Sequence, residues 1–173
     1  MPEIIIVAGP NGAGKTSFAR QYINTGPVTF TFVNADEIAR TLPHSGKSQV
    51  AIDLQATREM LKCIDDLATA RQSFMIETTL AALTYLDKIA AWQRAGYTVA
   101  LVFLRLPSAD HAIERVRRRV AAGGHDIPEE TIRRRFAMGR EYFEKYYKRA
   151  VDVWYVVDSF EGSYVLAEWP ENK

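Results

Sequence analysis

The sequence predicts an α/β protein in three layers, with helices on both faces of a five-stranded, mostly parallel sheet. Apolar runs typical of strands alternate with helical patterns along the whole chain, which is the order of elements that produces a parallel sheet. The run 98–104 is nearly continuous in apolar residues, as expected of a parallel strand that is covered on both faces. A glycine-rich loop at residues 9–16 follows the first apolar run directly.

The elements can be placed in order along the chain. Residues 4–8 form the first apolar run, and the helical pattern of 49–71 repeats apolar side chains at spacings of three and four. Gly96 supplies a left-handed cap before the fourth strand, and Pro128 with two following glutamates opens the last helix. We expect strands at 3–8, 29–34, 73–77, 98–106 and 152–158. We expect helices at 15–24, 36–41, 49–71, 83–95, 109–122 and 128–149.

Size and composition favour one soluble domain that spans residues 1–173. The chain is 47% hydrophobic and 25% charged, which is ordinary for a globular protein, and it shows no repeat or linker. Its net charge of +1 gives no reason to expect binding to nucleic acid or to a membrane. No apolar stretch approaches the ~20 residues of a membrane span, and the single Cys63 cannot form an internal disulfide. We therefore expect a cytoplasmic protein.

Residues 9–16 match the phosphate-binding pattern G-x-x-x-x-G-K-[ST] in full. The context is the required one, because a strand precedes the loop and a helix follows it. The glycines allow the backbone N–H groups to face phosphate oxygens, and the helix adds its positive dipole end. Lys15 is expected to reach the β- and γ-phosphates, and the Thr16 hydroxyl to ligate Mg²⁺. The predicted nucleotide-binding residues of this loop are Gly9, Pro10, Asn11, Gly12, Ala13, Gly14, Lys15, Thr16 and Ser17.

Carboxylates follow the second and third predicted strands. Asp36 comes just after the second strand, and Glu77 with Thr79 ends the third. Ligands of open α/β sheets bind at the carboxyl ends of the strands, so Asp36 is suited to take a proton from a substrate hydroxyl. Two other interpretations stay open, because Asp36 could cap the following helix and Glu77 could be an outer-shell Mg²⁺ ligand. No strand ends in the Asp-Glu typical of motor ATPases, and the Asn-Lys-x-Asp of GTPases is absent.

Arginines are concentrated between residues 115 and 140. Eight of the 22 basic residues lie in these 26 positions, on both sides of a Gly-Gly turn. Phosphoryl transfer depends on positioning and charge stabilisation, which a basic helical lid over the triphosphate would supply. A solvated basic face is the alternative. Within the predicted lid, Arg115 is assigned to nucleotide binding, and Arg119 and Arg134 to catalysis.

Four blocks of the sequence together resemble the zeta-toxin-like P-loop kinases, in particular their short bacterial members. The blocks are GPNGAGKTS, FVNADEIA, SFMIETTL and RVRRRVAAGGHDIPEETIRRRF, and the resemblance runs from about residue 3 to residue 158. It implies an adenylate-kinase-like P-loop NTPase fold and ATP- and Mg²⁺-dependent phosphorylation of a small molecule. Characterised zeta toxins phosphorylate a sugar hydroxyl of UDP-N-acetylglucosamine and are restrained by an antitoxin protein.

The resemblance also implies roles for individual residues. Lys15 and Thr16 are the P-loop pair, and Asp36 is the base or hydroxyl-orienting acid. Glu77 and Thr79 match the substrate-contacting E-x-T motif, while Arg119 and Arg134 correspond to phosphate-binding arginines. Larger toxins carry an arginine three residues after the base, where this chain has Ala39. This departure leaves the acceptor and the presence of an antitoxin open.

Two other functions are compatible with these motifs. One is a kinase of the same fold for another small molecule, such as an antibiotic, a nucleotide or a coenzyme precursor. The other is a module that holds ATP as a switch and acts through a protein partner. Carboxylates that face the γ-phosphate position favour a kinase, whereas carboxylates that are turned into core pairs favour the switch.

Overall fold

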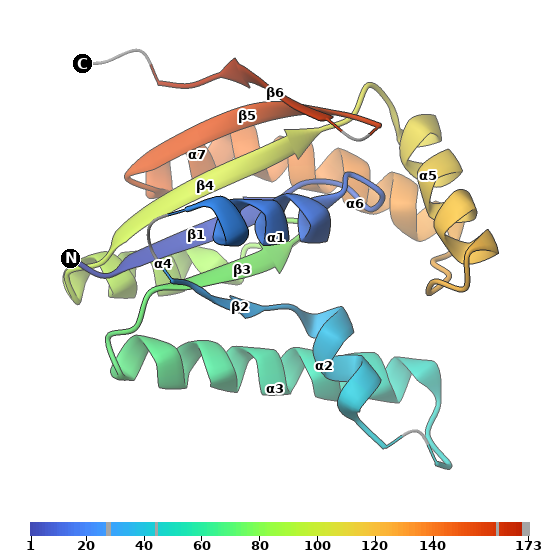
Figure 1. Ribbon diagram of the computed structural model, residues 1–173, viewed down its shortest axis with the longest axis horizontal. Coiled ribbons are helices and arrows are strands. Elements are labelled where there is room, and N and C mark those ends of the chain that lie inside the picture. The colour runs from blue at the N-terminus through green and yellow to red at the C-terminus, as the bar shows by residue number, and fades with distance from the viewer. Residues whose placement is uncertain (27–28, 44, 162, 171–173) are drawn as a thin grey trace.

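The computed structural model describes residues 1–26, 29–43, 45–161 and 163–170 and is built on one six-stranded sheet (Figure 1). The strands follow the order β2-β3-β1-β4-β5-β6. The pairs from β2 to β5 are parallel, and β6 runs antiparallel to β5. The strands are β1 (Glu3–Ala8), β2 (Thr31–Val33), β3 (Phe74–Thr78), β4 (Thr98–Arg105), β5 (Val153–Phe160) and β6 (Ser163–Glu168).

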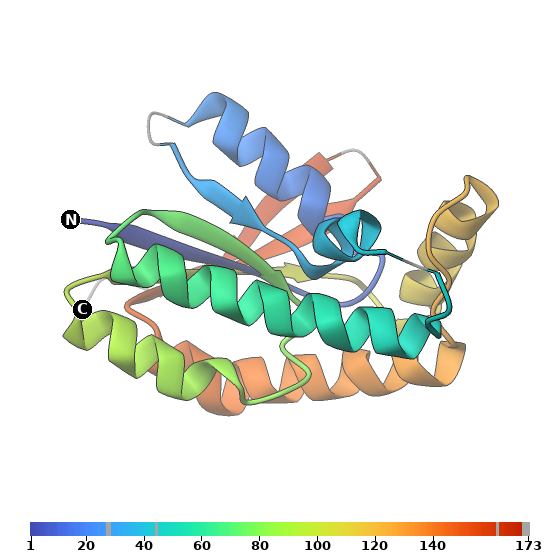
Figure 2. The same cartoon turned by 90° about the horizontal axis from the view of Figure 1, so that it is seen from below.

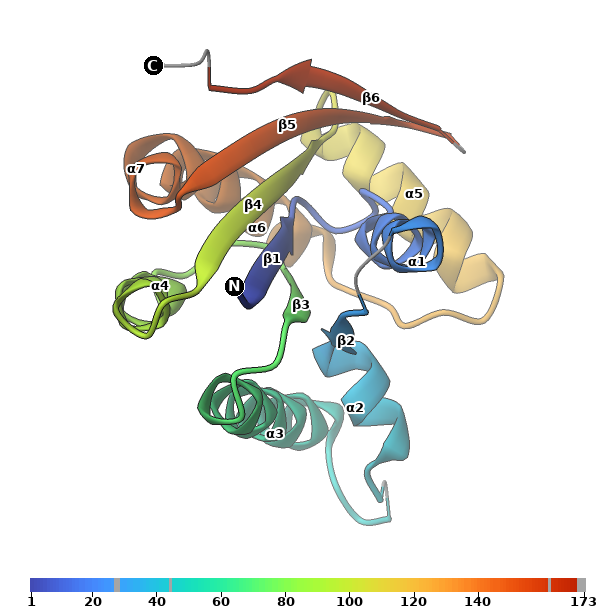
Figure 3. The ribbon, with the colours of Figure 1, turned by 60° about the vertical axis from the view of Figure 1, so that its left-hand side comes forward.

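Helices cover both faces of the sheet, which confirms the predicted three-layer α/β fold (Figures 2 and 3). One face carries α3, α4 and the long C-terminal helical segment, and the other carries α1 and α5. No helix of the described residues is both long and apolar enough to cross a membrane. The helices are α1 (Lys15–Thr25), α2 (Ala35–Thr41), α3 (Gln49–Thr69), α4 (Tyr85–Arg94), α5 (Ala109–Ala121), α6 (Glu129–Tyr142) and α7 (Lys148–Ala150).

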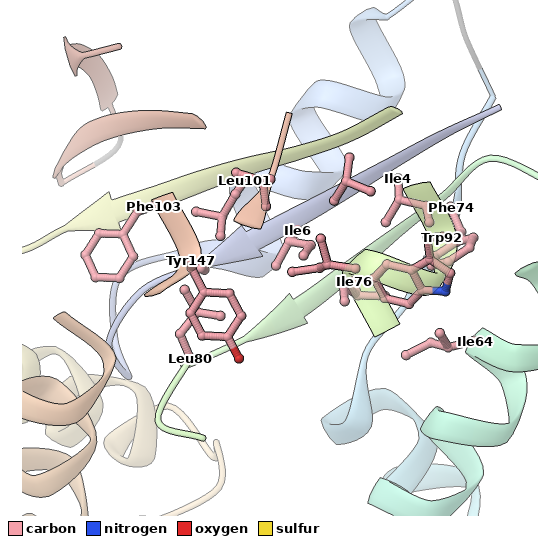
Figure 4. Close-up of a cluster of buried hydrophobic side chains, with 14 of the residues drawn as sticks. Ile4, Ile6, Ile64, Phe74, Ile76, Leu80, Trp92, Leu101, Phe103 and Tyr147 are labelled. Atoms are coloured by element: carbon pink, nitrogen blue, oxygen red, sulfur yellow. The ribbon is translucent and has the colours of Figure 1, made fainter. Parts of the chain in front are cut away.

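The central strand β1 contributes to both hydrophobic cores. Side chains of a strand point to alternate faces, so Ile4 and Ile6 pack towards α3 and α4, among Phe74 and Trp92 (Figure 4). The alternate residues, Ile5 and Val7, pack on the opposite side with α1 and α5. Five of the six residues of β1 are buried. The continuous apolar run at the start of the chain is therefore what a central strand covered on both faces requires.

The prediction of five strands was wrong by one, because β6 forms the edge of the sheet. β6 pairs with β5 through Asp158 opposite Val165 and Ser159 opposite Tyr164. Its residues are partly buried or exposed, and its sequence, SYVLAE, does not alternate between apolar and polar residues. An edge strand of this kind has no strong sequence signal, since its pairing and not its own hydropathy defines it.

The predicted helix 128–149 begins where expected but is not one regular α-helix. A π-helical turn, η1 (Phe143–Tyr147), separates α6 from α7. Phe143 and Tyr147 are both buried in the core on the α3 and α4 side. Residues four apart lie on one side of a helix, so both aromatic side chains pack against the same core.

Helix α6 passes the carboxyl end of β3 at very short range. Ile132 near its start packs in the α1 and α5 core, whereas Phe143 after its end packs in the opposite core. Between them, Gly139 is buried, and a Cβ atom at this position would lie 2.3 Å from the carbonyl oxygen of Thr79. Gly139 therefore allows the arginine-bearing helix to dock on the loop that follows Glu77.

We expect Gly139→Ala to destabilise the protein by about 1–3 kcal/mol, because the added methyl group overpacks this contact. Alanine is the better helix former, so helix propensity alone predicts that the substitution raises the free energy of unfolding by about 1 kcal/mol. Urea unfolding measures the difference. The exposed Ala137 on the same helix is the matched control, since Ala137→Gly should show only the propensity cost. A stabilised Gly139→Ala variant would contradict the close docking of α6 on Thr79.

Candidate active site

The glycine-rich loop connects β1 to α1 at the carboxyl edge of the sheet. Gly9 has a φ of 139°, and a Cβ atom there would lie 2.4 Å from the carbonyl oxygen of Leu104. Gly14 directly precedes α1 with a φ of 80°, and a Cβ atom on it would lie 2.9 Å from the Tyr164 hydroxyl. Both positions therefore require glycine, for conformation and for space. The loop takes the strand–loop–helix context that the motif demands.

Lys15 and Thr16 both contact the carboxylate of Glu77. The Lys15 Nζ donates a hydrogen bond of 3.0 Å to the Pro10 carbonyl and lies 3.8 Å from Glu77 Oε1. The Thr16 hydroxyl donates to Glu77 Oε2 at 2.7 Å. Parallel register explains the meeting, because Val7 of β1 pairs with Glu77 of β3. Glu77, next to the last residue of β3, is thus held against the residues that open α1.

The charges around Lys15 act on its pKa in opposite directions. Burial has the largest effect and lowers the pKa of Lys15, since the charged form loses its hydration. The negative charges of Glu77 and Asp36 raise the pKa, and the positive charges of Arg119 and Arg135 lower it further. These four side chains belong to four elements, α2, β3, α5 and α6, so charges from distant parts of the sequence act on Lys15.

Asn34 joins the second strand to this cluster. Val33 of β2 pairs with Ile76 of β3, so the next residue, Asn34, comes level with Glu77. Its Nδ2 donates to Glu77 Oε2 at 2.5 Å, and its Oδ1 accepts from the backbone N–H groups of Asp36 and Glu37 at 2.7 and 3.2 Å. Asn34 is therefore the cap of α2. Asp36 lies in the first turn of α2 and is exposed, so it is not the cap that the alternative interpretation suggested.

The back of the loop is held by the β5–β6 hairpin and α5. The Ser159 hydroxyl donates to the Ala13 carbonyl at 2.8 Å, and the Tyr164 hydroxyl donates to the Gly14 carbonyl at 2.9 Å. Arg115 donates to Gly12 O at 3.4 Å and to both oxygens of Ser159 at 3.0 and 3.1 Å. Three carbonyl groups of the loop therefore accept hydrogen bonds from α5 and from the hairpin. This arrangement directs the loop N–H groups away from the hairpin.

The lid arginines divide into those near Lys15 and those on the surface. The Arg119 guanidinium donates to the His125 carbonyl at 2.9 Å, while its Nε is buried without a partner among the described residues. Arg135 is half-buried on the side of α6 that carries Ile132 and Gly139. Arg134 is exposed, and its position is about 200° around the helix from Ile132. Of the two neighbouring arginines of α6, Arg135 is the less exposed, and its charge is one of those that lower the pKa of Lys15.

Other predicted site residues are placed as follows. Asn11 is buried in the loop, and its Oδ1 has no hydrogen-bond partner among the described residues. Thr79 lies after β3 with its carbonyl against α6.

Sequence reasoning missed Asn34, Arg135, Ser159 and Tyr164 as members of the site. The phase of the apolar residues Ile132, Phe136 and Gly139 on the last helix was the signal that could have identified Arg135.

The described residues contain no group of three or more His, Cys, Asp or Glu side chains that could hold a metal by themselves. The oxygen atoms of Thr16 and Glu77, 2.7 Å apart, do fit Mg²⁺. This cation prefers oxygen ligands and is usually held by one or two protein groups together with substrate phosphates and water. The donor set therefore suits Mg²⁺ that arrives with a nucleotide.

Residues 4–144 match the protein family AAA_33, described as an AAA domain. The chain belongs to this family. Among curated proteins, it is 23% identical over 134 residues to an uncharacterized protein of Haemophilus influenzae. The aligned residues make up 78% of this chain and 92% of that protein.

Solved structures with the same fold include several kinase-like proteins. A structure of the PezAT toxin–antitoxin system of Streptococcus pneumoniae matches with a TM-score of 0.74 and 17% identity, over 100% of this chain and 74% of the other. The structure of AvrRxo1-ORF1:-ORF2 with ATP matches with a TM-score of 0.73 and 16% identity, over 98% of this chain and 58% of the other. A gluconokinase of Sinorhizobium meliloti matches with a TM-score of 0.51 and 20% identity, over 91% of this chain and 83% of the other.

These matches show a kinase-like P-loop fold, which implies nucleotide binding, and they confirm the resemblance to zeta-toxin-like P-loop kinases. Two of the structures come from systems with a partner protein, an antitoxin or ORF2. The chain spans only 46% of the chain it matches in the Pnkp1/Rnl/Hen1 RNA repair complex, so it corresponds to a part of that protein.

We expect Tyr164→Phe to lower the free energy of unfolding by about 1 kcal/mol, because it removes the hydrogen bond to the Gly14 carbonyl. ATP affinity should fall as well, since the loop loses a fixed point beside Lys15. Chemical denaturation and calorimetric titration with ATP measure the two effects. Tyr22→Phe is the control, because Tyr22 is an exposed tyrosine of α1. Equal behaviour of the two variants would show that the hairpin does not support the loop.

Proposed function

We propose that this protein is an ATP- and Mg²⁺-dependent phosphotransferase that phosphorylates a hydroxyl group of a small molecule. The observation that carries the proposal is the contact of Lys15 and Thr16, from the phosphate-binding loop, with the Glu77 carboxylate at the carboxyl edge of a parallel sheet, where Asp36 opens the helix after β2. Acids for the acceptor and cations for the phosphates are the two requirements of this reaction.

The acids are proposed to act on the acceptor. Asp36 is exposed in the first turn of α2, where an incoming hydroxyl can reach it. As the acceptor oxygen forms its bond to the γ-phosphorus, the bond from that phosphorus to ADP breaks, and the hydroxyl proton passes to Asp36. Glu77 is held by Thr16 and Asn34, and its place next to Lys15 supports a role in orienting the metal and the acceptor together with Thr79.

The cations are proposed to act on the triphosphate. Lys15 opens α1 and would hold the β- and γ-phosphates with the loop N–H groups of residues 9–17. Arg119 has a buried, unpartnered N–H group, which a phosphate oxygen would satisfy, and Arg135 adds a second charge. Thr16 and Glu77 would hold Mg²⁺, which when bound neutralises phosphate charge. Arg115 would support binding indirectly, through its contact with Gly12.

The acceptor is proposed to lie on the β2–β3 side of the loop. A hollow of about 390 Å³ exists on the other side, between α6 and the ends of β4 and β5, lined by Pro10, Phe136, Arg140 and Phe160 among others. Strand β1 lies between that half of the sheet and the acids. An acceptor that meets Asp36 and Glu77 is therefore expected beside α2 and α3. UDP-N-acetylglucosamine is the first acceptor to test, and an antitoxin is the first partner protein to seek.

We expect Asp36→Asn to reduce acceptor phosphorylation by roughly 10²-fold or more, because the proton acceptor is lost. ATP affinity and the melting temperature should stay close to those of the wild type, since the cap of α2 is Asn34 and not Asp36. A panel of small-molecule hydroxyl acceptors, UDP-N-acetylglucosamine among them, is screened by an ATP-coupled assay and by mass spectrometry. Lys15→Ala is the contrasting variant and should lose nucleotide binding.

Two results would count against this proposal. Early melting or poor ATP binding of Asp36→Asn would make Asp36 a structural residue. If the wild type phosphorylates no acceptor while a bound protein changes its ATP affinity, the ATP-dependent switch is the better explanation.

A second prediction separates the two neighbouring arginines of α6. Arg135→Ala should lower kcat by about 10²-fold, because a preorganised charge on the transferring phosphoryl group is lost. Arg134→Ala is the matched control and should leave kcat near the wild-type value, since Arg134 is exposed on the outer side of the helix. Steady-state kinetics on the accepted substrate distinguish kcat from KM. Equal losses in both variants, or a loss in Arg134→Ala alone, would refute the assignment of Arg135.

A further inference from the structure

We infer that Asn34 is a positioning residue that sets Glu77 for the metal and, through the same amide group, places the acid Asp36 opposite it. The inference rests on the proposed function, because it assigns a role within the same site. The hydrogen bonds of the Asn34 side chain are made to Glu77 and to the backbone of Asp36 and Glu37, and none is made to a residue of the phosphate-binding motif. Its effect on the reaction is therefore indirect.

The side-chain amide of Asn34 bridges two elements. Its nitrogen donates to Glu77 Oε2 at 2.5 Å across the β2–β3 pair, while its oxygen accepts from the Asp36 N–H at 2.7 Å. The side-chain amide of asparagine carries a donor and an acceptor on one planar group. A displacement of Glu77 is therefore coupled to a displacement of the first turn of α2. Both contacts are made by one amide group, so a rotation about the side-chain bonds of Asn34 moves them together.

Burial makes this bridge specific. Asn34 is 5% exposed, so its polar atoms have little access to water and depend on these partners. Glu77 Oε2 accepts from both Asn34 and Thr16, which leaves Oε1 on the side of Lys15. The carboxylate is thus fixed in one rotation about its last side-chain bond. The Asn34 amide therefore helps to hold Oε2 against Thr16 and Oε1 beside Lys15.

The chemistry of metal sites gives the expected size of the effect. Groups that orient a metal ligand typically change metal affinity or activity by 10- to 100-fold when they are removed. The loss of the Asn34 amide should therefore weaken the response to Mg²⁺. Binding of the metal-free nucleotide should change little, because the loop N–H groups and Lys15 are left in place.

The test uses Asn34→Ser, which keeps a side-chain oxygen for the cap of α2 but removes the amide donor. Binding of a non-hydrolysable ATP analogue is measured by calorimetry with and without Mg²⁺. We expect the Mg²⁺-dependent gain in affinity to fall by about 10-fold relative to the wild type, and the metal-free affinity to be retained. Ser48→Ala is the control, because it removes the cap of α3 at a distance from the site. It should lower the melting temperature without changing the effect of Mg²⁺.

A second measurement does not depend on the variant. In ¹⁵N NMR spectra of the wild-type protein, the Asn34 side-chain amide should exchange slowly with solvent, and its resonance should shift when Mg²⁺ is added to the protein with the bound analogue. An unchanged Mg²⁺ gain in Asn34→Ser, or an Asn34 amide that exchanges rapidly and does not respond to Mg²⁺, would overturn the inference. The acceptor panel tests the proposed function separately. A wild type that transfers phosphate to no acceptor rejects the kinase, while the Mg²⁺ titration still decides on Asn34.

Discussion

The carboxylate of Glu77 joins three segments of the chain into one site. It accepts hydrogen bonds from Thr16 at the start of α1 and from Asn34 at the end of β2, and it lies beside Lys15. The sequence separations are 61 and 43 residues. The contact exists because β3 lies between β1 and β2 and pairs with both in parallel. Parallel pairing brings the carboxyl ends of all three strands to one edge, where the site is assembled.

The phosphate-binding loop depends on support from the opposite half of the sheet. Ser159 and Tyr164 of the β5–β6 hairpin and Arg115 of α5 bind the carbonyl groups of Ala13, Gly14 and Gly12. With its carbonyls satisfied from behind, the loop is left with N–H groups for an anion. Arg115 therefore has a different position from that of Arg119, although both lie on one face of α5. Arg115 donates to the loop carbonyl of Gly12, whereas Arg119 donates to the His125 carbonyl in the turn after α5.

The arginine-rich helices are also tied to the acids. Helix α6 packs on the loop after Glu77 through Gly139, and it crosses from one core to the other. A movement of this helix would therefore displace Thr79 and the end of β3. The charge on α6 and the carboxylate on β3 are parts of one packed unit, which agrees with a site that positions groups and stabilises charge.

The sequence alone determined the class of fold, the strand–loop–helix of residues 3–25 and the kinase-like character of the chain. These features depend on local patterns: apolar runs, glycines at fixed spacing, and acids that follow strands. The tertiary structure alone decided that β6 adds a sixth strand, that Asn34 and not Asp36 caps α2, and that Arg135 is less exposed than Arg134. These features depend on strand pairing and on which side of a helix is buried. Both are set by contacts between distant segments, so the residues themselves carry little local signal for them.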